Sequence, residues 1–311
     1  MSKLFRAHLA LFTVNALYGA NHVIAKGVMP GYLTPTVFIL MRVMGATALF
    51  WIIQGLFIRE KIARTDLGRL MLCALFGVMV NQLFFFHGLN LTSSVNSGII
   101  MTVNPIMVVI LSYFILRERI TWRKSTGIIT GAAGAILLTL TAGTGSGDSS
   151  MGDLFILINA TSYAIYLVLV KPLMAKYKPI TVITYVFTFG LMYILMFPLT
   201  WIELPAIDFS AIPKEAVIKI VFVIVAVTFL TYLLTVYGLK YTTPSVSSAY
   251  IYLQPVLVIG FAYLFAVMGI SDDYTDTITW DKVGYMLMIF TGVYLTSSSS
   301  FLRKKKSISR T

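Results

Sequence analysis

The sequence contains few charged residues and only one cysteine, and each shortage excludes a class of protein. Charged side chains make up 12% of the 311 residues, whereas a soluble domain carries about a quarter. This argues against a water-soluble fold. The single cysteine, Cys73, excludes an intramolecular disulfide and a cysteine-based metal cluster. We expect its side chain to be a small apolar group in the interior.

Catalytic patterns are also missing from the sequence. It contains neither a nucleotide-binding phosphate loop nor a GxSxG nucleophile motif. The three histidines, His8, His22 and His87, have no metal-ligand spacing. We therefore predict that the protein is not an enzyme and uses no cofactor and no metal, and we keep a membrane-embedded enzyme only as a weak alternative. Without a nucleotide-binding loop, any step that requires energy would have to be driven by a solute or ion gradient.

The positive charge of the chain does not indicate nucleic-acid binding. The formal net charge is +12, but the basic residues are dispersed over many loops and do not line one groove. The basic tail, residues 303–306, suits the anionic headgroups of a lipid bilayer, where each charge contributes about 1 kcal/mol. The predicted partners are a bilayer and a small-molecule solute, with no nucleic acid. A monomer and a homodimer both fit the sequence.

Apolar residues are abundant and form long runs. Hydrophobic residues make up 58% of the chain, and windows of about 19 residues, the length of a membrane-crossing helix, reveal ten apolar spans. We predict an all-α integral membrane protein with ten transmembrane helices. The predicted spans are 7–28, 33–57, 67–86, 94–116, 122–141, 153–172, 179–201, 216–237, 245–268 and 281–300.

The loops give these spans an orientation. If the N-terminus is placed in the cytoplasm, the inner segments hold 19 of the 24 Lys and Arg residues and the outer segments hold four. Cytoplasmic loops are enriched in Lys and Arg. We therefore expect both termini to be cytoplasmic in a multi-pass protein of the plasma membrane, the inner membrane in a bacterium.

The two halves of the chain echo each other. A shift of about 145–150 residues superposes similar residues in both halves, which indicates a duplication. We predict a first repeat over 1–146 and a second repeat with a basic cytoplasmic tail over 147–311. Since each repeat holds five spans, the second must be inverted relative to the first. The superposed pairs include Tyr18 and Tyr163, Lys26 and Lys171, Gly88 and Gly238, and Pro105 and Pro255.

Arg42 is the one charged residue well inside an apolar span, roughly 13 Å from the start of its helix at 1.5 Å per residue. Placing a charge at the bilayer centre costs at least about 2.5 kcal/mol, so such residues usually face the interior of the bundle. Arg42 is either an anchor for an anionic or carboxylate solute or a structural lock on helix-end carbonyls.

Other candidate residues follow from helical spacing. Tyr18, His22 and Lys26 share one face of the first span. His22 is either a pH-sensitive group or a hydrogen-bonded structural residue. The Lys26 side chain either faces the cavity or extends to the membrane interface. Tyrosines offer an amphipathic solute a π face and a hydroxyl. The tyrosines predicted to bind solute in the second half are Tyr163, Tyr166 and Tyr250.

Two prolines occupy matching positions in the fourth and ninth spans. Pro105 and Pro255 each free a carbonyl and kink the helix, which makes them candidate hinges or, alternatively, packing residues. The amides beside them, Asn104 and Gln254, are available to a solute or to the freed carbonyls.

Small residues also follow a pattern in the fifth and tenth spans. Gly127, Gly131 and Gly134, and likewise Gly284 and Gly292, predict close packing against a neighbouring helix or a second protomer.

Several of these segments together resemble the EamA branch of the drug/metabolite transporter superfamily. The resemblance covers essentially the whole chain and implies a ten-helix inverted-repeat carrier that moves small metabolites, often amino acids or their relatives and frequently outward. The segments that carry it are Tyr18-Gly19-Ala20-Asn21-His22, Arg42 with Ala46, Gly88-Leu89 with Asn104-Pro105, and Gly238-Leu239 with Gln254-Pro255.

The chain departs from the family pattern at three positions. It has Tyr18 where the family commonly has Trp, His22 where it has Phe, and Gln254 where it often has Glu. The last departure leaves proton coupling through a carboxylate at that position unsupported. We predict a secondary transporter, an exporter of amino acids or related carboxylates. The alternative is a facilitative exchanger or channel for phosphorylated or sugar-type solutes, for which Lys240 is the only basic candidate in the second half, and it lies in a loop.

Overall fold

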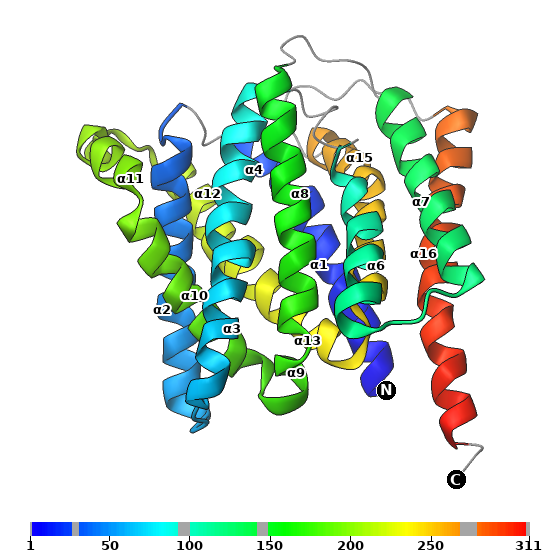
Figure 1. The fold of residues 1–311 in the computed structure, drawn as a ribbon. Helices are drawn as coiled ribbons and strands as arrows, with labels where there is room; N and C mark the ends of the chain where they lie inside the picture. Colours follow the sequence, from blue (N-terminus) through cyan, green and yellow to red (C-terminus); the bar gives the residue numbers. More distant parts are fainter. Residues whose placement is uncertain (1, 27–30, 93–99, 142–148, 268–278, 309–311) are drawn as a thin grey trace.

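The computed structural model describes residues 2–26, 31–92, 100–141, 149–267 and 279–308, and every regular element within these ranges is helical (Figure 1). The all-α prediction is therefore confirmed for the described residues. In the first half the elements are α1 (Lys3–Lys26), α2 (Pro35–Phe57), α3 (Arg64–Ala74), a π-helical turn (Leu75–Met79), α4 (Val80–Leu91), α6 (Val103–Leu116) and α7 (Trp122–Thr141).

The second half contains a corresponding series of helices. Two short 3-10 turns, Leu204–Ala206 and Phe209–Ala211, follow its fourth α-helix, α11. Its elements are α8 (Ser150–Val170), α9 (Leu173–Lys176), α10 (Pro179–Met196), α11 (Pro198–Glu203), α12 (Lys214–Phe222), a π-helical stretch (Val223–Leu230), α13 (Thr231–Tyr241), α14 (Pro244–Ala249), a 3-10 turn (Tyr250–Leu253), α15 (Gln254–Val267) and α16 (Trp280–Ile308).

Five continuous helices in the described ranges are long and apolar enough to cross a membrane. They span 35–57, 64–91, 150–176, 179–196 and 214–241. Large apolar side chains such as Phe57, Phe114 and Met196 are mostly exposed on the outside of the bundle. Hydrocarbon chains of a bilayer are a suitable environment for such a surface, because it would be costly in water.

Helix packing repeats between the two halves. α4 packs on α8 as α13 packs on α1, and α6 packs on α8 as α15 packs on α1. The remaining two major contacts join each helix to its own counterpart, α2 to α10 and α7 to α16. α1 and α8, the first helices of the halves, run in opposite directions in Figure 1. The packing thus follows the same duplication that the sequence shows.

π-helical geometry occurs at matching places in the two halves, at Leu75–Met79 and Val223–Leu230. A π turn changes the hydrogen-bond register of the helix and is frequent at functional sites. In the first half, the carbonyl of Phe76 accepts a hydrogen bond from the Ser162 hydroxyl at 2.5 Å. The π geometry was not predicted from the sequence, and it places backbone carbonyls of one half within reach of side chains from the other.

The contact between α7 and α16 is a backbone-to-backbone approach. A Cβ atom added to Gly292 would lie 2.5 Å from the amide nitrogen of Gly131 and 2.6 Å from the carbonyl oxygen of Gly127. The predicted close packing is confirmed for these three glycines, and it lies within one chain. Gly284 does not pack closely within the described part of the chain, since a Cβ there would meet no atom within 4 Å. Cys73 is fully buried, as expected.

The helical path is interrupted just before each of the two matched prolines. Thr102 forms a turn before α6, so Pro105 lies in the first turn of that helix. A 3-10 turn ends at Leu253, and Pro255 is the second residue of α15. Because proline has no amide hydrogen, it fits the first turn of a helix. Both prolines start a new helical segment after a break.

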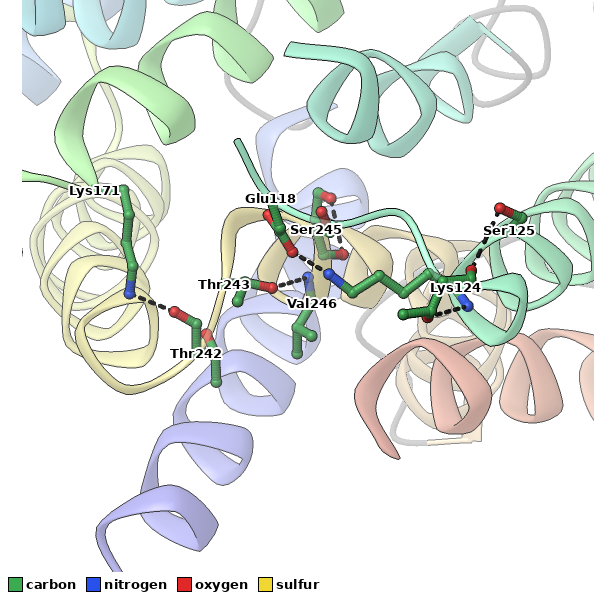
Figure 2. Close-up of polar contacts among 10 residues, drawn as sticks. Glu118, Lys124, Ser125, Lys171, Thr242, Thr243, Ser245 and Val246 are labelled. Atoms are coloured by element: carbon green, nitrogen blue, oxygen red, sulfur yellow. Dashed lines mark hydrogen bonds and ion pairs between the residues drawn. The ribbon is translucent and has the colours of Figure 1, made fainter. Parts of the chain in front are cut away.

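Lys171 joins the end of α8 to the end of α13. Its ammonium group donates hydrogen bonds to the carbonyl oxygens of Leu239 and Thr242, each at 2.5 Å, and Figure 2 shows the bond to Thr242. A lysine at this place offsets the negative end of the helix dipole. It also donates to carbonyls that the helix itself leaves unpaired. Nearby, Glu118 and Lys124 form a buried ion pair beside the start of α14 (Figure 2).

Replacing Lys171 with methionine is expected to lower the free energy of unfolding by about 1.5–3 kcal/mol, because two carbonyls lose a charged donor. The matched control is Lys176→Met, since the Lys176 side chain is 56% exposed where it pairs with Asp66, and exposed ion pairs contribute about 0.2–1 kcal/mol. Thermal unfolding of both purified variants in detergent measures the difference. Equal losses would contradict this role for Lys171.

Candidate functional site

A buried arginine occupies the interior of the bundle, where α2 meets the second half. Arg42 is 4% exposed, and its Nε donates a hydrogen bond to the hydroxyl of Thr228 at 3.0 Å. The guanidinium carbon lies 4.7 Å from the ring centre of Phe86 and 5.5 Å from that of Phe38. Aromatic faces attract the cation, and they also close it off from lipid. The prediction that Arg42 faces inward is confirmed.

The Arg42 guanidinium is only partly compensated. Its Nη1 atom is buried and has no hydrogen-bond partner among the described residues, and within those residues no carboxylate forms an ion pair with it. The Thr228 hydroxyl is a neutral acceptor that gives its own proton to the carbonyl of Val223 at 2.8 Å. A buried charge normally requires a counterion. The site thus presents an unsatisfied donor to any anion that enters it.

Tyrosines surround the arginine. The hydroxyls of Tyr18 and Thr231 are hydrogen-bonded at 3.3 Å, and Thr231 follows three residues after Thr228, the hydrogen-bond partner of Arg42. The Tyr232 hydroxyl donates to the carbonyl of Gly77 at 3.0 Å. α1, α2, the π turn before α4 and α13 therefore converge on one polar cluster.

Two further tyrosines come from α8. The rings of Tyr163 and Tyr166 are 5.8 Å apart, and Tyr166 lies 6.5 Å from Tyr232, measured between ring centres. Tyr166 is fully buried and its hydroxyl has no partner among the described residues. Its ring occupies space left by Gly77, where a Cβ would be 2.4 Å from the Tyr166 Cδ2 atom. Of the predicted residues, the fold thus brings together Tyr18, Arg42, Tyr163 and Tyr166.

Sequence reasoning missed several members of this cluster, above all Tyr232 and Gln82. The Gln82 side-chain nitrogen donates to the Tyr232 hydroxyl at 3.5 Å. The two residues are exactly one repeat, 150 positions, apart, so they are equivalent positions that touch each other. Thr102 and Tyr252 do the same, with the Tyr252 hydroxyl donating to the Thr102 carbonyl at 3.4 Å. The repeat offset itself was the signal that could have identified both pairs.

Three predicted binding residues lie at other helix contacts. The Asn104 amide donates to the carbonyl of Ala160 at 2.6 Å, and the Gln254 amide donates to Asn15 Oδ1 at 3.0 Å. Ala160 and Asn15 are equivalent across the repeat, so the two amides join equivalent interfaces, α6 with α8 and α15 with α1. The Tyr250 hydroxyl is 2.8 Å from His8 Nδ1. None of the three has a recorded contact with Arg42.

The remaining predicted residues are only partly described. His22 and Lys26 lie on α1 and Pro255 lies on α15, but the side chains of all three are outside the described residues, as is most of the basic tail. Among the residues that the structure describes, no group of His, Cys, Asp and Glu is arranged to hold a metal ion.

A helical bundle made of two similar halves, with a buried charge and tyrosines where they meet, is the architecture of a membrane transporter built from repeats. The chain belongs to the EamA-like transporter family, whose model matches residues 5–140 and again 150–298. The family resemblance read from the sequence is thereby confirmed. The protein is a transporter and not an enzyme.

The named relatives agree with this assignment. The uncharacterized transporter YyaM of Bacillus subtilis is 28% identical over 82% of this chain and 85% of its own length. YetK of the same organism, also an uncharacterized transporter, is 26% identical over 68% of this chain, and the match spans 64% of YetK. A probable terminal-alkyne amino-acid exporter of Streptantibioticus cattleyicolor is 26% identical over 67% of this chain and 68% of its length.

A solved crystal structure shares the fold. It superposes with a TM-score of 0.70 and covers 94% of this chain and 97% of its own, at 16% sequence identity.

Proposed function

We propose that the protein is a secondary carrier that exports small polar solutes bearing a carboxylate, such as amino acids, by alternating access around Arg42. In this proposal ten helices cross the plasma membrane as two inverted five-helix repeats, 1–146 and 147–311, with both termini in the cytoplasm. The inner membrane is the location in a bacterium. The carrier works as a monomer or homodimer without a cofactor, and a solute or ion gradient drives it.

The observation that carries the proposal is the uncompensated guanidinium of Arg42. Its Nη1 is buried without a partner, and no carboxylate pairs with it in the described part of the chain. Keeping such a group dehydrated costs free energy, and a carboxylate from the solute would offset that cost with a charge-assisted hydrogen bond. The function therefore explains an arrangement that is unfavourable for folding alone.

The tyrosines complete the proposed binding site. Tyr18, Tyr163, Tyr166 and Tyr232 add aromatic faces and hydroxyls around the charge, which suits a solute with both polar and apolar parts. Asn104, Tyr250 and Gln254 are better assigned to helix contacts. The breaks before Pro105 and Pro255 are the proposed hinges on which the two halves move during the transport cycle.

The name of one relative favours both the solute class and the direction, since it is called an amino-acid exporter. The alternative, a carrier or channel for phosphorylated or sugar-type solutes, is less well supported. A phosphate dianion generally requires more than one cation, whereas the described cluster contains Arg42 alone. Lys240 lies at the end of α13, and its ammonium group donates a hydrogen bond to the carbonyl of Tyr177 at 3.3 Å.

A counterflow screen tests the proposal. Proteoliposomes are preloaded with amino acids, organic acids or sugar phosphates, and exchange is compared between the wild type and Arg42→Ala. Carboxylate-bearing solutes are expected to exchange with the wild type only. Equal exchange by a folded Arg42→Ala protein, or exchange of sugar phosphates alone, would refute the proposed site.

A further inference from the structure

Gln82 is another incompletely bonded polar group next to Tyr232. It lies on α4, 3% exposed, and its side-chain oxygen is buried with no partner among the described residues. A buried amide oxygen without a donor costs about as much as a lost hydrogen bond. The sequence alone does not single out Gln82, and the carboxylate site around Arg42 does not use it.

The orientation of the Gln82 amide follows from its neighbour. The Tyr232 hydroxyl has one proton, and it donates that proton to the carbonyl of Gly77 at 3.0 Å. Towards Gln82, 3.5 Å away, the same hydroxyl can therefore only accept. The Gln82 amide must present its NH₂ group to Tyr232, because the opposite orientation would bring two acceptors together. Its oxygen is thus an acceptor that faces away from Tyr232.

Two neighbours place this acceptor near the buried cation. The Tyr232 hydroxyl receives the Gln82 amide, and Gln82 lies one helical turn before Phe86, whose ring centre is 4.7 Å from the Arg42 guanidinium carbon. Among the described residues the cluster therefore contains, besides the Tyr166 hydroxyl, a cationic donor without a partner, Arg42 Nη1, and a neutral acceptor without a partner, Gln82 Oε1. A solute that satisfies both Arg42 and Gln82 must have an anionic acceptor and a hydrogen-bond donor.

We propose that Gln82 is the specificity-determining residue that binds the amino group of the solute while Arg42 binds its carboxylate. This inference rests on the proposed function and adds how the site distinguishes an amino acid from other carboxylates. A 2-hydroxy acid still provides a donor, but a neutral one. A 2-oxo acid provides only acceptors, so it leaves the Gln82 oxygen unsatisfied, and sites of this type discriminate strongly against such ligands.

The test compares matched solutes that differ only at the second carbon. The probes are alanine, leucine and phenylalanine, each with its 2-hydroxy acid and its 2-oxo acid. The readout is the solute concentration that gives half of the maximal thermal stabilisation of the full-length protein in nanodiscs. The wild type is expected to bind amino acids about 10- to 100-fold more tightly than the 2-oxo acids, the range for a hydrogen bond to a charged group. Gln82→Met should bring this ratio close to one and leave 2-oxo acid binding unchanged.

Two further variants make the outcome decisive. Gln82→Glu keeps an acceptor and adds negative charge, so it should retain or increase the preference for the amino acid. Gln54→Met is the matched control, because Gln54 is also buried on a spanning helix with an unpartnered oxygen but lies roughly 18 Å from Arg42 along α2 at 1.5 Å per residue. It should not alter the ratio.

The possible failures can be told apart. If Gln82→Met binds normally but still prefers amino acids by the wild-type factor, the role of Gln82 is refuted while the Arg42 site stands. If Gln54→Met changes the ratio as much as Gln82→Met, the effect is not local and the inference is also refuted. If no solute of the set shows binding that Arg42→Met removes, the carboxylate site itself is wrong.

Discussion

Arg42→Met is expected to reduce exchange of carboxylate solutes by at least about thirtyfold while leaving the thermal stability of the protein unchanged or increased. Removing one partner of a buried, hydrogen-bonded charge pair costs about 2–5 kcal/mol of binding. In the protein without solute, however, the described residues give Arg42 no charged partner and a single hydrogen bond, to Thr228. Exchanging it for an apolar side chain of similar length removes a desolvation cost.

The expected loss of transport without a loss of stability distinguishes the two roles that the sequence left open for Arg42, a solute anchor and a structural lock. A structural lock would lose stability when its arginine is removed, and transport would fall because the bundle loosens. A solute anchor would lose transport only. The measurements are counterflow in proteoliposomes and the unfolding temperature in detergent. Arg42→Lys serves as the control, because lysine keeps the positive charge but lacks the planar guanidinium that donates two hydrogen bonds to one carboxylate. A marked fall in the unfolding temperature of Arg42→Met would identify a lock.

Gly292→Ala is expected to destabilise the protein by about 1–3 kcal/mol, the usual cost of overpacking a well-packed contact. The added methyl group would lie 2.5 Å from the backbone nitrogen of Gly131 and 2.6 Å from the carbonyl of Gly127. These are backbone atoms, which cannot rotate away as a side chain can. α7 and α16 would have to separate along their contact.

Gly284→Ala is the control on the same helix and should have the opposite effect. A Cβ at Gly284 meets nothing within 4 Å, and alanine is favoured over glycine in a helix interior by about 0.5–1 kcal/mol. Thermal unfolding in one detergent compares the two variants. If both lost stability equally, the close approach at Gly292 would not explain its effect.

The sequence predicted the features that hydrophobicity and duplication determine. The helical class follows from long apolar runs, since an unpaired backbone is too costly in a bilayer. The inward position of Arg42 follows from the cost of a charge facing lipid, and the α7 contact follows from the spacing of Gly127 and Gly131. Gly284 has no such contact within the chain, because a small residue permits close packing but does not require it.

Other features depend on three-dimensional detail that the sequence does not encode visibly. The π turns arise from a one-residue change in hydrogen-bond register, which leaves no pattern of polarity. Asn104 and Gln254 were predicted to be available to a solute because they are polar and lie in apolar spans, and their hydrogen bonds to neighbouring helices could not be read from that pattern. Tyr232 was overlooked because it follows a strongly apolar stretch, although the offset of 150 places it on Gln82.

The contact between Gln82 and Tyr232 has a consequence for how such a protein can vary. In an assembly of two identical half-chains, a position that touches its own copy must hold the same residue twice, so any charge there or nearby would also be doubled. Joining the halves in one chain removes this restriction. Arg42 then needs no second arginine, and its equivalent, Phe187, instead packs edge-on against Tyr232 at 4.7 Å. A single polypeptide thereby keeps a two-fold scaffold around one unrepeated positive charge.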